Sequence, residues 1–204
     1  MVVKFQAVRL ETQALGAARG YRVLFSNLEL KVEPGECLEL RGPNGSGKST
    51  LLRILAGLTR AQAGEVRYLD APDGVFRQYL GHHDGVKPNE TARSQVRFWS
   101  RFNGLSNAAA DAALERVGLA PRADVPGRGL SAGQKRRLAL ARLVMDPKPV
   151  WLLDEPTAAL DVAGASLVRD LAAEHCANGG IVIAAIHGEG FSGARRFAFP
   201  EVAA

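Results

Sequence analysis

The chain has few cysteines, few aromatic residues and no long apolar run, and each shortage excludes a class of protein. Its 204 residues include two cysteines and 6% aromatic residues. Two cysteines far apart in the sequence make neither a disulfide framework nor a metal-binding pattern, and we expect Cys37 to be a small core residue. The longest purely apolar run, residues 181–186, is too short to cross a membrane. The first residues lack the apolar core of a signal peptide, so we expect a cytoplasmic protein.

The chain carries a net charge of +5, with 47% hydrophobic and 23% charged residues, which is ordinary for a water-soluble α/β protein. Its basic residues are scattered, and the one dense cluster is Lys135-Arg136-Arg137. A solvated basic surface is the favoured interpretation, and attraction to an anionic membrane surface is the second. Nucleic acid is the least favoured partner, and we expect none.

Residues 42–50 read Gly-Pro-Asn-Gly-Ser-Gly-Lys-Ser-Thr and match the phosphate-binding pattern G-x-x-x-x-G-K-[ST]. Glycines allow the backbone to curl so that successive N–H groups face one phosphate chain. Lys48 is then expected to reach the β- and γ-phosphates, and the Ser49 hydroxyl to ligate Mg²⁺. The predicted nucleotide-binding residues of this loop are Gly42, Pro43, Asn44, Gly45, Ser46, Gly47, Lys48, Ser49 and Thr50.

Hydrophobic periodicity predicts strands alternating with helices on both sides of this loop. Strands are expected at residues 3–10, 23–41 with a turn at 34–35, 64–69, 150–153 and 181–186. Helices are expected directly after the loop (apolar stripe Leu51, Leu52, Ile54, Leu55 and Leu58), from about residue 91 (stripe Val96, Trp99 and Phe102), and at 108–117, 135–145 and 162–177. Apolar strands alternating with helices indicate a parallel sheet covered on both faces. We expect a single domain with a core of residues 1–83 and 147–204 and an inserted helical lobe of residues 84–146.

Two carboxylates follow the apolar strand Val150-Trp151-Leu152-Leu153. An acid at the carboxyl end of a buried parallel strand, opposite a phosphate loop, suits Mg²⁺ binding, and this role is assigned to Asp154. Glu155 is then placed to orient and deprotonate an attacking water. A strand ending in a single capping acid is the alternative, and the intact phosphate loop argues against it.

Residues Leu130-Ser131-Ala132-Gly133-Gln134 precede a helical stretch. Taken alone they are a helix cap, with exposed N–H groups and the positive end of the helix dipole. Together with the phosphate loop and the acidic strand end, they resemble the signature of the ATP-binding-cassette family. The resemblance extends to Ala159-Leu160-Asp161, which match the D-loop of that family, and to His187, which matches its switch histidine.

This resemblance implies an α/β P-loop nucleotide-binding domain with a mainly parallel core sheet, an antiparallel β subdomain and the inserted helical lobe. It implies ATP and Mg²⁺, and a head-to-tail homodimer in which each ATP lies between the loop of one copy and Ser131, Gly133 and Gln134 of the other.

Two positions depart from the pattern of the family. Where the family has a glutamine that contacts Mg²⁺ and the attacking water and couples to the membrane subunit, this chain has His83. An imidazole also forms hydrogen bonds, so we assign His83 to the catalytic set with Glu155 and His187. The family also stacks an aromatic residue on adenine; that position falls on Ala18 or Arg19, with Tyr21 as an approximate substitute.

The chain further resembles the ATP-binding subunits of bacterial haem exporters for cytochrome c maturation, on the basis of Tyr79-Leu80-Gly81-His82, Lys87, residues 130–137 and His187. That resemblance implies an ATPase on the cytoplasmic face of the inner membrane, bound peripherally to a separate permease of the cytochrome c maturation protein B type.

Other interpretations remain. A cassette serving another transporter is one, and a soluble non-transport cassette is another. Lys48 and Ser131 are only 83 positions apart, which leaves no room for the long coiled coil of repair-type cassettes. A catalytically dead scaffold conflicts with the simultaneous presence of Lys48, Asp154, Glu155 and His187. A haem-ligand role for His82 and His83 is also open, although a coupling loop needs no metal.

Overall fold

The computed structural model describes residues 4–74 and 76–199, which form two compact units. The first unit takes the described residues of Met1–Gly81, Lys148–Glu155 and Ala172–Ala204. The second takes His82–Pro147 and Pro156–Leu171.

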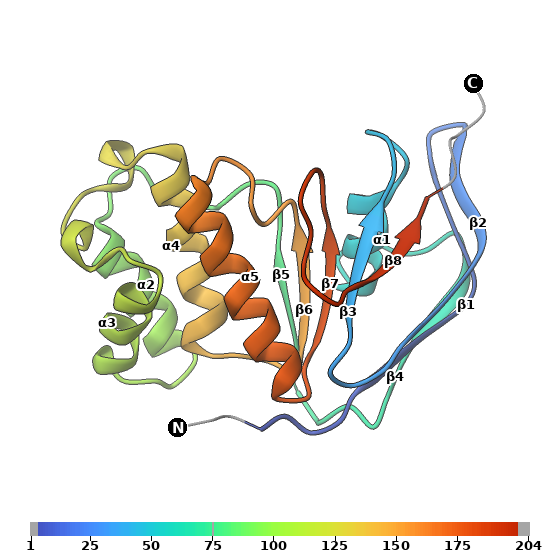
Figure 1. Cartoon of the computed structure of the whole chain (residues 1–204), viewed down its shortest axis with the longest axis horizontal. Coiled ribbons are helices and arrows are strands. Elements are labelled where there is room, and N and C mark those ends of the chain that lie inside the picture. The colour runs from blue at the N-terminus through green and yellow to red at the C-terminus, as the bar shows by residue number, and fades with distance from the viewer. Residues whose placement is uncertain (1–3, 75, 200–204) are drawn as a thin grey trace. The chain divides into compact units, whose positions relative to one another are not determined.

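A five-stranded parallel sheet lies at the centre of the first unit (Figure 1). Its order is β5 (Arg77–Leu80), β6 (Val150–Asp154), β7 (Ile181–Ala185), β3 (Cys37–Arg41) and β8 (Arg195–Ala198). Every residue of β6 and β7 is buried, as their unbroken apolar sequences predict. Because all five strands run in the same direction, their carboxyl ends meet at one edge of the sheet, and the candidate site residues of this unit follow β3, β6 and β7 there.

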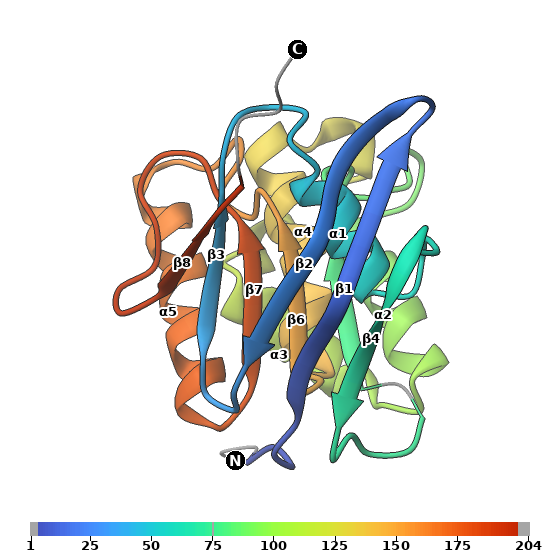
Figure 2. The ribbon, with the colours of Figure 1, turned by 90° about the vertical axis from the view of Figure 1, so that its right-hand side faces the viewer.

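A second, antiparallel sheet has the order β2 (Arg22–Val32), β1 (Arg9–Arg19) and β4 (Ala63–Leu69). Figure 2 shows this sheet facing the viewer, with helix α1 (Lys48–Leu55) and the parallel sheet behind it. One hydrophobic core joins the three layers, through Leu51, Leu52 and Leu55 of α1 and apolar side chains of both sheets. Each fully buried leucine contributes about 2 kcal/mol to stability, so this core fixes the helix that follows the phosphate loop. The predicted fold class is confirmed.

Four helices dominate the second unit: α2 (Ala92–Phe102), α3 (Asn107–Arg116), α4 (Ala132–Met145) and the first residues of α5 (Val162–Ala177). Two single 3-10 turns, Ala120–Arg122 and Gly127–Gly129, lie between α3 and α4. The side chains of Thr91, Ser106 and Ser131 cap α2, α3 and α4, each accepting a hydrogen bond from a backbone N–H of the first turn. The predicted helices are therefore present, and α5 has the predicted bounds.

Among the strands, one prediction was wrong in its bounds, one was right, and one strand was missed. The strand expected at 3–10 begins at Arg9 and continues to Arg19, and residue 3 lies outside the described residues. The prediction of strands within residues 23–41 on either side of a turn at 34–35 is confirmed, and these strands are β2 and β3. Strand β8 was not predicted, because its sequence Arg-Arg-Phe-Ala lacks an apolar run; it adds to the outer edge of the sheet beside β3.

Two residues of the expected apolar stripes do not face the core. Leu58 lies beyond the end of α1 and Phe102 ends α2, and both side chains are largely exposed. Cys37 is half-buried rather than a core residue. The neighbouring thiol of Cys176 and burial raise the pKa of Cys37. Among the described residues, no helix combines the length and the apolar character needed to cross a membrane.

Candidate active site

The phosphate-binding loop connects β3 to α1 in the first unit, where the sequence predicted it. Gly42, Gly45 and Gly47 have φ values of 147°, 78° and 106°, which favour glycine over residues with a Cβ. Gly47 precedes the first helical residue, and no side chain caps α1. The amides of the first turn of α1 are therefore left to a ligand, and the helix dipole favours an anion there.

Lys48 is almost fully buried and lies over this loop. Its Nζ donates to the carbonyl oxygens of Gly42 and Pro43, each at 2.8 Å. An ammonium group has three hydrogens, so the two carbonyls leave one for a phosphate oxygen. Burial lowers the pKa of Lys48, and the carboxylates of Glu155 and Asp154 act in the opposite direction.

The interior of the loop fits an anion closely. Ser46 Oγ is buried and has no hydrogen-bond partner within the described part of the chain. A Cβ on Gly42 would approach that of Phe199 to 2.9 Å, and one on Gly47 would lie 3.1 Å from side-chain atoms of Leu24 and Phe25. A donor without a partner and a cradle that excludes side chains are both expected of a phosphate site.

Asp154 ends β6 and lies beside the start of α1. Its Oδ1 accepts a hydrogen bond of 2.9 Å from Ser49 Oγ, and its Oδ2 accepts one of 3.4 Å from the Tyr79 hydroxyl. Burial raises the pKa of Tyr79, so the phenol remains a neutral donor. A hydroxyl and a carboxylate this close are hard oxygen ligands of the kind that Mg²⁺ prefers, with waters and phosphates completing the shell. Mg²⁺ therefore fits the residues present.

Glu155 and His187 approach each other next to this pair. His187 Nε2 lies 3.5 Å from Glu155 Oε1, and both side chains are partly exposed. Glu155 has a φ of 49°, unusual for a residue other than glycine, and its N–H donates to Ala185 O of β7 at 3.0 Å. Such backbone strain is often found at reaction sites. The structure thus brings together the loop, Ser49, Asp154, Glu155 and His187.

Ser131, Gly133 and Gln134 belong to the second unit, at the N-terminus of α4. Ser131 Oγ accepts from Gln134 N at 3.2 Å, and Gln134 Oε1 accepts from Ser131 N at 3.0 Å. These two bonds form a capping box. A Cβ on Gly133 would lie 2.9 Å from Ala159 O, so the backbone of 159–161 approaches this helix end closely.

Asp161 follows this close approach and is held in place. Its Oδ1 accepts from Gly164 N at 2.8 Å and from Arg137 Nη2 at 3.0 Å. The Gly164 amide and then the Arg137 guanidinium lower the pKa of Asp161, which keeps it ionised.

His83 lies exposed in the segment between β5 and α2, with its ring edge-on to that of His82 at 5.5 Å. The next residue, Asp84, accepts a hydrogen bond of 2.9 Å from Arg136 Nη1, and Arg136 Nε donates to Pro156 O at 3.2 Å. Arg136 is buried, so the expectation of a solvated basic cluster at 135–137 was wrong for this residue.

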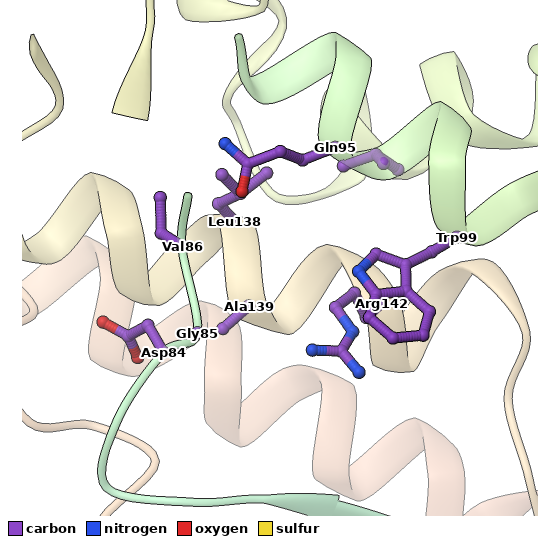
Figure 3. A pocket seen from close by; sticks show the side chains of 9 residues that line it. Asp84, Gly85, Val86, Gln95, Trp99, Leu138, Ala139 and Arg142 are labelled. Atoms are coloured by element: carbon purple, nitrogen blue, oxygen red, sulfur yellow. The ribbon is translucent and has the colours of Figure 1, made fainter. Parts of the chain in front are cut away.

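Gln95 stabilises the other end of the same segment, and Arg142 packs against α2 nearby. Gln95 Oε1 accepts from Lys87 N at 2.9 Å, and its Nε2 donates to Lys87 O at 3.1 Å. Figure 3 shows Arg142 against the indole of Trp99, and the guanidinium carbon lies 4.0 Å from the ring centroid. The pocket these residues line holds about 10 Å³, roughly the room of one water. It is a packing gap, too small for a ligand.

The residues considered for adenine lie at the turn between β1 and β2. Tyr21 and Arg19 are exposed and Ala18 is half-buried. Because Gly47 packs against Leu24, this hairpin reaches the phosphate loop. An aromatic ring at Tyr21 remains a prediction for base recognition.

The sequence did not point to Tyr79, nor to the pair of Asp84 and Arg136. Tyr79 was named only as part of the motif Tyr79-Leu80-Gly81-His82, although a tyrosine near the carboxyl end of β5 is adjacent to β6 and hence to Asp154. The Asp84–Arg136 pair joins residues 52 positions apart, and no local pattern signals it.

Comparison with known proteins places the chain in a family. The model of the ABC transporter family matches residues 25–158. A cytochrome c biogenesis ATP-binding export protein CcmA from Hyphomonas neptunium is 47% identical over 87% of this chain and 89% of the relative. Proteins of the same name from Methylococcus capsulatus and Rhizobium meliloti are 48% and 44% identical, over 86% and 92% of this chain and 89% and 96% of theirs.

A solved structure supports the fold independently. The putative ABC transporter ATP-binding protein from Pyrococcus furiosus superimposes with a TM-score of 0.81 over 94% of this chain and 97% of that one, at 20% identity. The chain therefore belongs to the ABC transporter family of ATP-binding proteins, and within it to the cytochrome c biogenesis ATP-binding export proteins.

Proposed function

We propose that this protein is the ATP-hydrolysing subunit of a bacterial ABC complex that drives haem export or handling in cytochrome c biogenesis. The observation that carries the proposal is the cluster formed by the phosphate loop, the Ser49–Asp154 pair and the Glu155–His187 pair. The export named for the relatives supports the assignment to cytochrome c biogenesis.

In this proposal each residue has one role. The loop amides and Lys48 bind the phosphates of ATP, and Ser49 and Asp154 would hold Mg²⁺, which supplies positive charge to the β- and γ-phosphate oxygens. Glu155 accepts the proton of the attacking water. His187, next to Glu155, holds the Glu155 carboxylate in position relative to the γ-phosphate.

We propose that the whole chain, residues 1–204, acts as a single ATPase domain and pairs head-to-tail with a second copy. The N-terminus of α4, with Ser131, Gly133 and Gln134, is then the surface that meets the ATP of the partner copy. The closeness of Ala159 O supports this, because it excludes a side chain at position 133 of this helix end.

We propose that the protein docks peripherally on a permease at the cytoplasmic face of the inner membrane, and that His83 couples ATP turnover to it. The exposed place of His83, on a segment held by Asp84 and Gln95, supports this role. Permease-stimulated ATPase activity should be retained in His83→Gln, because the family carries glutamine at this position. It should fall in His83→Ala and stay unchanged in the neighbouring control His82→Ala. Equal stimulation in both alanine variants would contradict the role of His83.

The haem assignment is tested in the native host. Deleting the gene should abolish holocytochrome c while apocytochrome remains, and wild-type protein should restore it. Lys48→Ala should not restore it, whereas Lys31→Ala should, because Lys31 is an exposed lysine paired with Glu11 on the antiparallel sheet. Normal holocytochrome c in the deletion strain, alongside ATPase activity of the purified protein, would contradict the haem role and leave the ATPase assignment intact.

A further inference from the structure

A fully buried carboxylate, Glu39, lies in the middle of β3, the strand that leads into the phosphate loop. Its Oε2 accepts from Arg41 Nε at 2.9 Å and from Arg41 Nη2 at 2.7 Å. Exposed Arg196 adds a longer contact, with Nε 3.5 Å from Oε2. Burying a charge costs free energy unless partners compensate for it, so this buried ion pair indicates a role beyond strand packing.

The pair also holds the loop that follows β7. Arg41 Nη1 donates to Gly188 O at 2.6 Å, and Phe191 N donates to Glu39 Oε1 at 2.5 Å. These bonds hold the loop at residues 188 and 191, and the first of them lies one residue after His187. A Cβ on Gly190 would overlap Glu39 Oε1 and Arg41 Nη2, so the loop backbone lies directly on the ion pair.

We propose that the Glu39–Arg41 pair positions His187 for ATP hydrolysis. The inference rests on the proposed ATPase function and adds to it two residues outside the assigned catalytic and nucleotide-binding set. His187 projects from a partly exposed loop, and its 3.5 Å approach to Glu155 requires the backbone at 188 to stay in place. Charge-assisted hydrogen bonds in a buried setting are strong enough to do this.

The test separates ATP binding from turnover. Because a misplacement of about 1 Å can cost about 10²-fold in rate, Arg41→Gln should lower kcat by about 10- to 100-fold while Kd for ATP changes by less than about twofold. Glu39→Gln keeps only one acceptor oxygen and turns an NH2 group toward the N–H of either Arg41 or Phe191, so it should also lower kcat by about 10- to 100-fold. The matched control is Arg195→Gln, which removes a pair with Glu36 between β8 and the start of β3 and leaves the loop untouched. Its kcat should match the wild type.

A double-mutant cycle with His187→Ala shows whether the pair acts through His187. In that background Arg41→Gln should lower kcat by less than about twofold, because the side chain it positions is already absent. Independent, multiplicative losses would overturn the proposal. Wild-type kcat in Arg41→Gln together with reduced kcat in His187→Ala would also overturn it, without touching the proposed function. Wild-type turnover in His187→Ala would instead contradict the role of His187 in the proposed function.

Gly190→Ala provides a second route should Arg41→Gln fail to fold, since it disturbs the loop while keeping both charges. It should lower kcat without changing Kd for ATP, and amide exchange at Phe191 should accelerate while that of β3 stays slow. Unchanged kcat with accelerated exchange at Phe191 would show that the loop contact does not serve turnover.

Discussion

His175, near the C-terminus of α5, should make stability depend on pH in a predictable direction. Its ring stacks on Trp151 with centroids 4.0 Å apart, lies 4.7 Å from the ring of Phe5, and is 4% exposed. Its Nε2 lies 3.1 Å from Pro149 O. Burial lowers the pKa of His175 to about 4, and the hydrogen bonds with the backbone oppose this only partly.

The direction of this pH dependence follows from proton binding in the folded and unfolded states. The unfolded imidazole takes up its proton near pH 6.5 and the folded one near pH 4, so the unfolded state binds more protons between these values. The stability contributed by neutral His175 is complete above the unfolded pKa and is lost as the pH falls through this window. The two pKa values differ by about 2.5 units, which lowers the free energy of unfolding by about 3 kcal/mol at or below pH 4. About 2 kcal/mol of this loss occurs between pH 7 and pH 5.

Urea unfolding of the wild type and of His175→Gln across this pH range measures the effect. Carboxylates titrate in both proteins, so the difference between the two stability profiles isolates the imidazole. The wild type should lose about 2 kcal/mol more than His175→Gln between pH 7 and pH 5. Parallel profiles would refute the burial argument.

Three further predictions concern the candidate site and its support. Ser131→Arg should abolish the ATP-dependent dimer measured by light scattering in the Glu155→Gln background, whereas Ser106→Arg, at the equivalent cap of α3, should leave it intact; a dimer in both would contradict the head-to-tail arrangement. Gly42→Ala should weaken ATP binding by at least about tenfold in calorimetry, because the loop must shift to accept a methyl group; unchanged affinity would contradict this. Asp84→Asn should cost about 2 kcal/mol in urea unfolding by weakening a charged hydrogen bond to Arg136, and a loss below about 0.5 kcal/mol would contradict that pairing.

The parts of the site that the sequence could predict are local in the chain. The phosphate loop is one continuous segment, and its glycines stand at the positions where the structure has positive φ angles. Asp154 and Glu155 follow an unbroken apolar strand, so their place at the sheet edge follows from the strand itself. Whether these residues perform the assigned steps stays a prediction.

The rest depends on contacts between distant segments. Cys37-Leu38-Glu39-Leu40 alternates like a strand with one solvated face, yet Glu39 is buried because the loop after β7 covers it. Strand β8 pairs with β3 through its backbone, and its two arginines give it a composition typical of a loop. In the same way Arg136 has the composition of a surface residue and reaches Asp84 only in the folded chain.

The most direct measurement of the central claim is Mg²⁺-dependent ATP turnover by the wild type and by Glu155→Gln, alongside the affinity of each for ATP. The amide still hydrogen-bonds water but cannot take its proton, so turnover should fall by about 10²–10⁴-fold while the affinity for ATP is retained. Turnover near the wild-type rate in Glu155→Gln, measured in the complex with the permease, would contradict the assignment of Glu155 as the base.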